Sequence, residues 1–277
     1  MKRIVIIGAT SGIGYEVAKI YRQLGWRVGV AGRRLERLEA FREQAPEQTE
    51  IQQLDVTEVE AVDKLHLLID KLGGMDLFLL STGVGNQNRT LNPDIELATV
   101  NTNAIGFTRM VTAAYHYFKE QGCGHLAVIS SIAGTKGLGV APSYSATKRF
   151  QNTYIDALAQ LARMEKLPIT FTDIRPGFVK TALLKNDNYP LLMRPERVAQ
   201  RIVRALKRKK RTVIIDWRYV TLVFFWKLIP DYIWERFCEW AIAPAATGTM
   251  RRIEALQQAL AHRPIHPGSD AHKVFRQ

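Results

Sequence analysis

The chain has 277 residues, and its 39 lysines and arginines outnumber its 26 aspartates and glutamates, giving a formal net charge of +13. This length suits one large α/β domain, or a domain with an appendage, that needs no disulfide or metal to support its core. The only two cysteines, Cys123 and Cys238, are far apart, which excludes a disulfide framework and indicates a reducing, cytoplasmic location.

Short apolar segments alternate with segments of helical periodicity from the first residues to Asp216. The opening MKRIVIIGAT has an apolar run too short for a signal peptide, so we interpret it as a first strand. Segments typical of buried parallel strands lie at residues 2–8, 26–32, 50–56, 75–83, 125–131, 168–177 and 211–216. Helical segments lie at residues 14–25, 34–44, 57–74, 97–121, 144–166 and 195–210. We expect Thr57 to be an N-cap, and Asp76 and Asp173 to be ordinary caps near strand termini.

This alternation indicates βαβ units. It predicts an α/β fold: a doubly wound, parallel, seven-stranded sheet with helices on both faces.

The pattern changes after Asp216, where residues 217–248 are apolar and aromatic and hold four of the five tryptophans. Lys227 and Pro230 interrupt this segment, whereas a membrane-spanning helix needs about 20 mostly apolar residues. We predict two short helices that meet at Pro230. They could cap the substrate end of the sheet or form an oligomer contact. Alternatively, residues 217–243 could insert into a membrane interface, where Trp and Tyr flanked by Lys and Arg are common.

The densest basic run, KRKKR at residues 207–211, follows an apolar-periodic segment. Cations suit the last turn of a helix, which is the simplest interpretation. Contact with an anionic membrane is the alternative. We expect no nucleic-acid partner, because no base-stacking or base-reading module is visible.

A glycine-rich turn, GATSGIG, joins the first strand to the first helix and contains Gly8, Gly12 and Gly14. Glycines at such a turn let the backbone approach a pyrophosphate, which then lies at the helix N-terminus. The second strand ends in Arg33 and Arg34, where an enzyme that uses NAD typically has an acidic residue. Arginine suits a 2′-phosphate, so the sequence predicts NADP(H) as the cofactor.

The stretch YSATK places Tyr144 and Lys148 four residues apart, one turn apart on the same face of a helix. A nearby ammonium lowers the pKa of a phenol, which could then exchange a proton near neutral pH. The six histidines show no metal-ligand spacing, and we expect no metal site.

With these motifs in this order, residues 3–216 resemble the short-chain dehydrogenase/reductase (SDR) family, whose Rossmann fold has the predicted architecture. The resemblance rests on the glycine turn, Asp55-Val56, STGVG after the fourth strand, NAIG, SSIAG, YSATK and RPGFVKT. It implies that Asn103, Ser131, Tyr144 and Lys148 are the catalytic residues. The positions that it assigns to the cofactor are Gly8, Thr10, Ser11, Gly12, Ile13, Gly14, Arg33, Arg34, Asp55, Val56, Ser81, Gly83, Tyr144, Lys148, Pro176, Gly177, Val179 and Thr181.

The resemblance also implies a role for each catalytic group. Tyr144 would exchange a proton with the substrate oxygen, which Ser131 would orient. Lys148 would lower the pKa of the tyrosine and bind the nicotinamide ribose, and Asn103 would hold a water chain. Two departures stand out: Ile7 replaces a common threonine, and Ser81-Thr82-Gly83 replaces Asn-Ala-Gly, which puts a contact between neighbouring strands in doubt.

The predicted organisation therefore has three parts. Residues 1–216 form the NADP-binding catalytic domain, residues 217–262 a helical extension packed on the same domain or at an interface, and residues 263–277 a loose tail. The predicted function is reduction of a carbonyl, or oxidation of an alcohol, by a homodimer or homotetramer. An apolar loop at residues 182–194 indicates a lipid-like substrate. A nucleotide-binding sensor or scaffold with little activity is the alternative.

Overall fold

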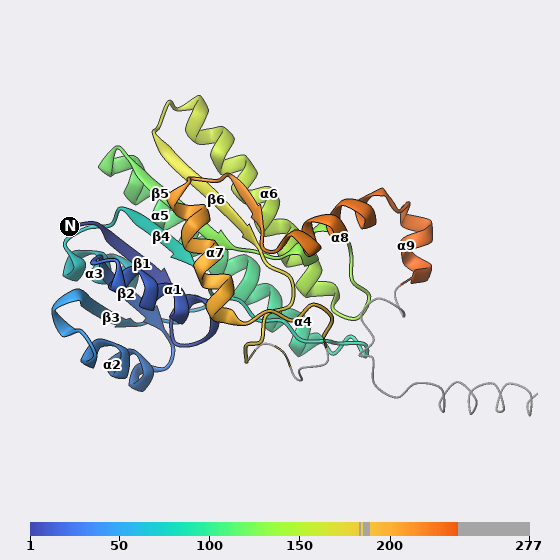
Figure 1. Cartoon of the computed structure of the whole chain (residues 1–277), viewed down its shortest axis with the longest axis horizontal. Helices are drawn as coiled ribbons and strands as arrows, with labels where there is room; N and C mark the ends of the chain where they lie inside the picture. The colour runs from blue at the N-terminus through green and yellow to red at the C-terminus, as the bar shows by residue number, and fades with distance from the viewer. Residues whose placement is uncertain (183, 185–188, 238–277) are drawn as a thin grey trace, which may run out of the picture. The chain divides into compact units, whose positions relative to one another are not determined.

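The computed structural model describes residues 1–182, 184 and 189–237. Seven parallel strands form one sheet in the order β3-β2-β1-β4-β5-β6-β7 (Figure 1). The strands are β1 (Arg3–Ile7), β2 (Arg27–Gly32), β3 (Thr49–Gln53), β4 (Leu77–Leu80), β5 (Gly124–Ile129), β6 (Ile169–Arg175) and β7 (Thr212–Ile214). The predicted doubly wound sheet is confirmed.

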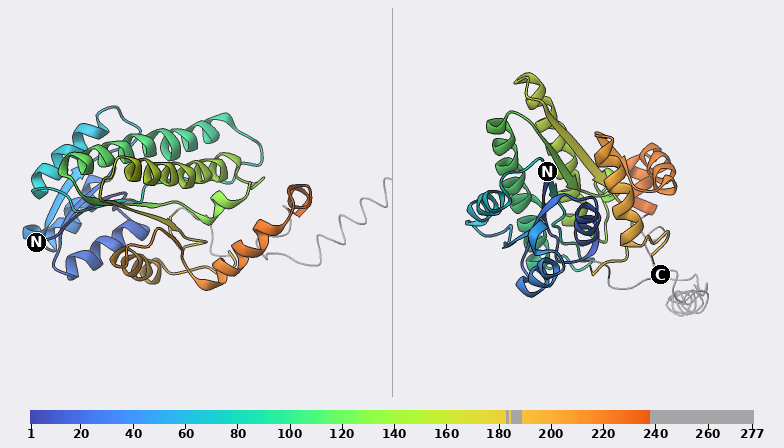
Figure 2. Two further views of the ribbon diagram at one scale, coloured as in Figure 1. Left: turned by 90° about the horizontal axis from the view of Figure 1, so that it is seen from above. Right: turned by 60° about the vertical axis from the view of Figure 1, so that its left-hand side comes forward.

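Helices cover both faces of this sheet (Figure 2). Those on one face are α1 (Gly12–Gln23), α2 (Leu35–Glu43) and α7 (Pro195–Lys207). Those on the other are α3 (Ala61–Leu72), α5 (Phe107–Gln121) and α6 (Pro142–Met164). Further elements are α4 (Pro93–Val100), α8 (Trp217–Leu228), α9 (Asp231–Phe237), two 3₁₀ turns, η1 (Pro46–Gln48) and η3 (Ile132–Thr135), and a π-helical segment, η2 (Asn101–Gly106).

Strand β1 shows why the strand segments are continuous apolar runs in the sequence. Ile4 and Ile6 pack in the core on the α1–α7 side, whereas Val5 and Ile7 pack in the core on the α3–α5 side. All four side chains are almost fully buried. A parallel strand covered on both faces needs apolar residues at every position, which explains the absence of alternation.

Two predicted helices differ from the observed ones. The helix predicted at residues 97–121 contains the π-helical segment η2, where Gly106 packs against Val56. The helix predicted from residue 57 begins at Ala61, and Thr57 is not its N-cap. Instead the amide and the hydroxyl of Thr57 both donate to Asp55 Oδ1, at 3.0 and 2.8 Å, and this local turn delays the helix.

The prediction of two short helices after Asp216 is confirmed, because α8 and α9 are separated at Ile229 and Pro230. Tyr219 and Val223 of α8 are buried in the same core as α1 and α7. Among the described residues no helix is both long and apolar enough to cross a bilayer. The predicted tail at 263–277 and the part of the extension from residue 238 lie outside the described residues.

The sheet has a switch point between β1 and β4. The chain runs from β1 outward through β2 to β3, and then returns to place β4 on the other side of β1. In open α/β sheets, ligands bind at the carboxyl ends of the strands beside such a point.

Candidate active site

The predicted site residues gather at the carboxyl edge of the sheet. One or more of them follows each of six strands: Gly8 after β1, Arg33 after β2, Asp55 after β3, Ser81 after β4, Ser131 after β5 and Pro176 after β6. Because the strands are parallel, these ends share one edge. Gly12 lies against the Thr181 side chain, so the glycine turn also meets the segment after β6.

The glycine turn leaves room for a ligand at the start of α1. Gly8 has φ +90°, and a Cβ there would lie 2.7 Å from the amide nitrogen of Thr82. A Cβ on Gly14 would collide with the carbonyl oxygen of Gly8. Ser11, the N-cap residue of α1, makes no side-chain capping bond. The first amides of α1 are therefore suited to bind an anion such as a pyrophosphate.

The two arginines after β2 flank this turn. Arg34 Nη2 donates to Thr10 Oγ1 at 2.6 Å and to Ser11 Oγ at 2.7 Å. Arg33 Nη1 lies 3.8 Å from Asp55 Oδ2, and the Arg33 side chain is 72% exposed. Burial, and then the like charges of Arg37 and Arg33, lower the pKa of Arg34. An anionic ligand would offset this repulsion.

Tyr144 lies in the first turn of α6, after Pro142, beside the serine that follows β5. A Cβ on Gly85 would lie 2.6 Å from the tyrosine ring, so the loop after β4 closes over it. Burial raises the pKa of Tyr144, and a hydrogen bond with Ser131 acts in the opposite direction. Ser131 Oγ also accepts from the amide of Ala133 at 3.0 Å, which fixes the serine side chain.

Lys148 is the charged group behind Tyr144. Its Nζ lies 5.7 Å from the centroid of the tyrosine ring, and the residue is 4% exposed. The ammonium donates to the Ile129 carbonyl oxygen at 3.2 Å and to Gln151 Oε1 at 3.0 Å. Burial lowers the pKa of Lys148 to about 8, against the opposing charge of Asp173. The lysine therefore stays mostly charged at pH 7 but can lose its proton in mildly alkaline solution.

Asn103 holds the loop after β4. Its Oδ1 accepts from the amide of Val84 at 2.9 Å, and its Nδ2 donates to the carbonyl oxygen of Val84 at 2.7 Å. The backbone oxygen of Asn103, in the π-helical segment, accepts from Gln151 Nε2 at 2.8 Å. Gln151 thus connects the backbone of Asn103 to the ammonium of Lys148.

Sequence reasoning missed Gln151, although a signal existed. Lys148, Gln151 and Ile155 are spaced i, i+3 and i+7, which places them on one face of a helix. Gln151 and Ile155 are 1% and 0% exposed. A polar residue between a lysine and an apolar residue on a buried face needs a partner, and here it bonds two predicted catalytic residues.

The interpretation of Asp173 as an ordinary cap is wrong, because Asp173 is fully buried within β6. Its carboxylate accepts from Ser130 Oγ, from Asn152 Nδ2 at 3.2 Å and from Arg175 Nε at 2.7 Å. Ser130 directly precedes Ser131 in the chain, so this network supports the backbone of the candidate site next to Ser131.

Several predicted cofactor residues have apolar side chains that belong to the core. Val56 and Val179 are buried in the core, and Ile13 packs against it. The departure at Ser81 leaves the neighbouring strands connected, because the Ser81 amide donates to the Ile7 carbonyl oxygen at 2.8 Å.

The aromatic extension contacts this edge at two places. Tyr219 Oη accepts from the amide of Phe178 at 3.1 Å and donates to the carbonyl oxygen of Pro190 at 3.0 Å. Trp226 Nε1 donates to Thr135 Oγ1 at 2.9 Å, and Trp234 Nε1 donates to the Gly137 carbonyl oxygen at 2.7 Å. Helices α8 and α9 therefore tie down the segments after β5 and β6.

The predicted substrate loop at residues 182–194 is described only in part. Leu183 and residues 185–188 lie outside the described residues. Tyr189 packs on Phe178, with ring centroids 4.8 Å apart. Met193 is buried in the core, where its backbone pairs with that of Phe178 and Val179.

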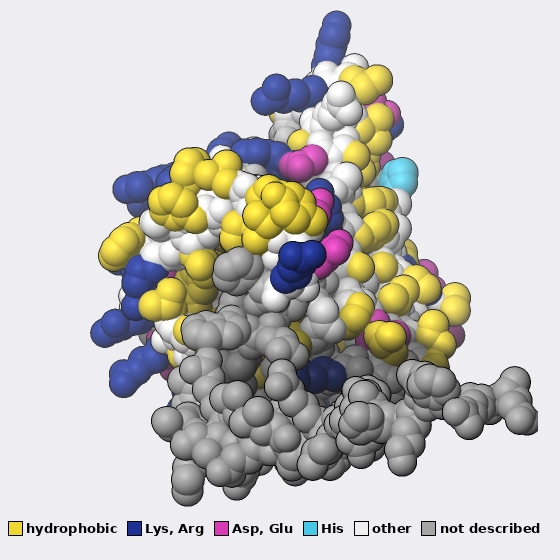
Figure 3. Space-filling model, turned by 90° about the vertical axis from the view of Figure 1, so that its right-hand side faces the viewer, with side chains coloured by type: hydrophobic (Ala, Val, Ile, Leu, Met, Phe, Trp, Pro, Cys, Tyr) yellow, Lys and Arg dark blue, Asp and Glu magenta, His cyan; other side chains and the backbone are white. Residues whose placement is uncertain are grey.

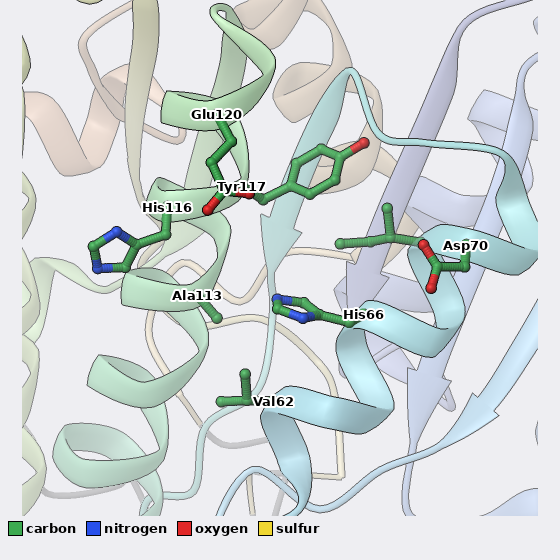
Figure 4. A pocket seen from close by; sticks show the side chains of 8 residues that line it. Val62, His66, Asp70, Ala113, His116, Tyr117 and Glu120 are labelled. Atoms are coloured by element: carbon green, nitrogen blue, oxygen red, sulfur yellow. The ribbon is translucent and has the colours of Figure 1, made fainter.

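A shallow hollow between α3 and α5 contains none of the predicted site residues (Figure 4). His66 of α3 and His116 of α5 border it; the imidazole of His66 points toward α5, whereas that of His116 points away from α3 (Figure 4). In the part of the chain that the structure describes, no group of three His, Cys, Asp or Glu residues is placed to hold a metal ion.

Comparison with known proteins points to one family. The family model "short chain dehydrogenase" matches residues 2–190. A protein of Myxococcus xanthus named "Uncharacterized oxidoreductase" is 30% identical over 239 residues, covering 83% of this chain and 94% of that protein. A second model, for the C-terminal domain of GSCFA domain proteins, matches only residues 253–277, which lie outside the described residues.

Solved structures share the fold. An alcohol dehydrogenase from Thermococcus sibiricus, complexed with 5-hydroxy-NADP, superposes with a TM-score of 0.69 at 23% identity, covering 78% of this chain and 96% of that one. A 3-ketoacyl-(acyl-carrier-protein) reductase from Brucella melitensis, complexed with NADH, has a TM-score of 0.69 at 22% identity, with the same coverage.

Proposed function

The chain belongs to the short-chain dehydrogenase family of oxidoreductases, and from this premise we propose that it is an NADP(H)-dependent carbonyl reductase that uses Tyr144 as its general acid. In the reverse direction the same groups would oxidise the alcohol. The observation that carries the proposal is the buried Lys148 ammonium beside the ring of Tyr144, which itself hydrogen-bonds Ser131.

Each polar side chain has one task in the proposed reaction. The Ser131 hydroxyl positions the substrate oxygen, and the Tyr144 hydroxyl donates its proton to that oxygen as negative charge develops there. The Lys148 ammonium stabilises the phenolate that remains. The nicotinamide, when bound, supplies the hydride. The open glycine turn, the uncapped start of α1 and the Arg34 guanidinium fit such a dinucleotide.

Gln151 joins this proposal as a positioning residue. Its amide oxygen faces the Lys148 ammonium and its amide nitrogen faces the Asn103 carbonyl oxygen. A buried ammonium needs acceptors to stay charged. Gln151 adds a direct link between Lys148 and the Asn103 backbone, and the Asn103 side chain fixes the loop at Val84. The water chain expected at Asn103 stays a prediction.

The preference for NADP(H) rests on the end of β2. Arg33 and Arg34 stand where a carboxylate would bind the ribose hydroxyls of NAD. Arg34 Nη2 donates a hydrogen bond to Ser11 Oγ in the glycine turn. A 2′-phosphate bound there could accept a hydrogen bond from the same guanidinium. Titration of the protein with NADPH and with NADH tests this preference: equal affinity would contradict it.

We further propose an apolar, lipid-like substrate, a homodimeric or homotetrameric assembly and a cytoplasmic location with peripheral membrane contact through residues 217–243. The proposed substrate class is supported by the aromatic side chains of Tyr189, Trp226 and Trp234 on segments beside the site.

NADPH consumption on a panel that runs from small polar ketones to long-chain carbonyls tests the substrate class. Faster turnover of the long-chain carbonyls is expected, and no preference would contradict it. Tight NADPH binding without turnover of any carbonyl would instead favour a sensor or scaffold.

A further inference from the structure

Helix α8 is apolar around most of its circumference. Tyr219 and Val223 face the core and are 1% and 3% exposed. On the opposite side, Trp217, Phe224 and Leu228 follow one another at helical spacing and are 72%, 61% and 65% exposed. A helix that is apolar on all sides is normally buried on all sides. The core covers the buried face of α8, so only the outer face still needs a partner to cover it.

The exposed residues form a patch rather than isolated side chains. Phe225, also 61% exposed, contacts Phe224 with ring centroids 5.4 Å apart, and exposed Tyr232 on α9 lies beyond Pro230. Figure 3 shows apolar side chains gathered on this side of the molecule. Single exposed apolar residues are common on proteins, but contiguous patches mark interaction surfaces.

A stripe of arginines lies next to the patch. Arg197, Arg201, Arg204 and Arg208 repeat at i, i+4, i+7 and i+11 along α7 and its C-cap, and all are exposed. Arg201 Nη1 pairs with Asp216 Oδ2 at 3.1 Å, and Asp216 is the N-cap of α8. This contact joins the stripe to the beginning of the aromatic face. Figure 3 shows Lys and Arg side chains along the edge of the apolar region.

We propose that the outer face of α8 and the arginine stripe of α7 form a docking surface for an anionic lipid bilayer, an inference that rests on the membrane contact proposed above and assigns its residues and its lipid class. Trp, Phe and Leu on one face with Arg at its border is the composition of elements that lie in the headgroup region. Basic residues at the membrane surface add attraction to anionic lipids. A second copy is a poorer occupant, because it would bring two arginine stripes towards each other at a net charge of +13 per chain.

The docking surface is close to the candidate active site without being part of it. The inward-facing side of α8 and α9, through Trp226 and Trp234, bonds residues 135 and 137, which follow Ser131. The outward-facing Trp217, Phe224 and Leu228 make no contribution to the proposed chemistry. Vesicle binding therefore tests the surface whether or not the protein turns over a carbonyl.

The test is flotation of the purified full-length protein with vesicles of phosphatidylcholine alone and of phosphatidylcholine mixed with phosphatidylglycerol. We expect binding to the anionic vesicles that weakens with salt. The triple change Trp217→Ser, Phe224→Ser and Leu228→Ser should reduce that binding at least tenfold. The triple change Arg197→Gln, Arg204→Gln and Arg208→Gln should also reduce it at least tenfold, since basic residues near the membrane surface add attraction to anionic lipids.

A matched control carries serine at Val59, Leu97 and Met164, which are 80%, 67% and 74% exposed but lie on other elements. This control should bind vesicles like the wild type, and circular dichroism should show that every variant is folded. Wild type that stays with the lipid-free fraction, or an aromatic variant that floats like the control, would overturn the proposal. The proposal would also be overturned if the wild type bound no vesicles and were a dimer, while the aromatic variant were a monomer. That result would identify a second copy of the chain as the occupant.

Discussion

Helices α6 and α8 depart from the usual amphipathic pattern in opposite directions. Helix α6 buries polar groups, since Lys148, Gln151 and Asn152 are all at most 6% exposed. Helix α8 exposes apolar groups, among them Trp217 and Phe224. Burying a charge is costly unless it is paired, and exposing a large apolar face is costly unless something covers it. We interpret the buried polar groups of α6 as part of the proposed chemistry, and the exposed apolar groups of α8 as part of the proposed docking surface.

The two helices also differ in what satisfies them. The buried side chains of Lys148 and Gln151 on α6 are satisfied within the fold, because they bond each other and the backbones of Ile129 and Asn103. The outer face of α8 finds no such partner among the described residues. Changes on α6 should alter turnover and its pH dependence, whereas changes on the outer face of α8 should alter neither.

The largest effect is expected for Lys148→Met. Turnover should fall by about 10²–10⁴-fold, because the phenolate of Tyr144 loses its stabilising charge. The thermal midpoint at pH 7 should fall only modestly, because removal of the buried ammonium offsets part of the cost of leaving Gln151 Oε1 without its partner. A loss of activity that is fully explained by unfolding of the variant would contradict this role for Lys148.

Lys148→Met also changes the pH dependence of stability. The pKa of this lysine is about 8 when folded and 10.5 ordinarily, so between these values the unfolded chain binds more protons than the folded one. Wild-type stability should therefore gain a rising contribution across this window. Denaturant midpoints measured from pH 8 to 10.5 should show this contribution in the wild type and not in the variant.

Arg34→Ser tests the neighbouring cofactor edge. Loss of a charge-assisted contact to a 2′-phosphate should weaken NADPH binding about 10- to 100-fold and leave NADH binding nearly unchanged. Fluorescence titration with both cofactors measures the difference. Arg37→Ser, an exposed change one turn further along α2, is the control. Equal weakening of NADPH and NADH by Arg34→Ser would count against a 2′-phosphate contact.

A smaller effect is expected for Gln151→Leu. Removing the amide oxygen should lower the pKa of Lys148 further, because the ammonium loses an acceptor. A lysine that is charged less of the time stabilises the phenolate less, so the pKa of Tyr144 should rise. The acid limb of kcat/KM for alcohol oxidation should shift to higher pH by about one unit. Ile155→Val, a core change on the same face of α6, should lower stability without moving this limb. If the acid limb of the pH profile does not shift in Gln151→Leu, then Gln151 only packs in the core and does not act on Tyr144.

The smallest effect is expected on the outer face of α8. Phe224→Ser should change the free energy of unfolding by no more than about 0.5 kcal/mol, as surface substitutions usually do. The adjacent Val223→Ser should cost about 2 kcal/mol or more, because Val223 is buried and serine would lose its packing and desolvate a hydroxyl. Urea denaturation of both variants measures this contrast. Similar costs would mean that the outer face is also packed.

Most of the fold followed from local pattern. A strand buried on both faces, such as β1, is apolar throughout, and the helices between strands have clear periodicity. The glycine turn and the Tyr144–Lys148 pair are also local, so their positions could be predicted without a structure.

The remaining features depend on contacts between distant elements. The role of Gln151 requires Asn103, which lies 48 residues earlier. Tyr219 acts on Phe178, 41 residues earlier, and Asp173 accepts from Ser130, 43 residues earlier. Sequence reasoning gave no partner for any of these side chains, because the order β4-β5-β6 decides which strand ends meet.

The most direct test of Tyr144 as the general acid is NADPH consumption by wild type and Tyr144→Phe on the same panel of carbonyls. We expect that the wild type consumes NADPH with at least one carbonyl, and that the variant binds NADPH with unchanged affinity but turns over at least about 10²-fold more slowly. Equal turnover by the two proteins would contradict the assignment of Tyr144 as the general acid.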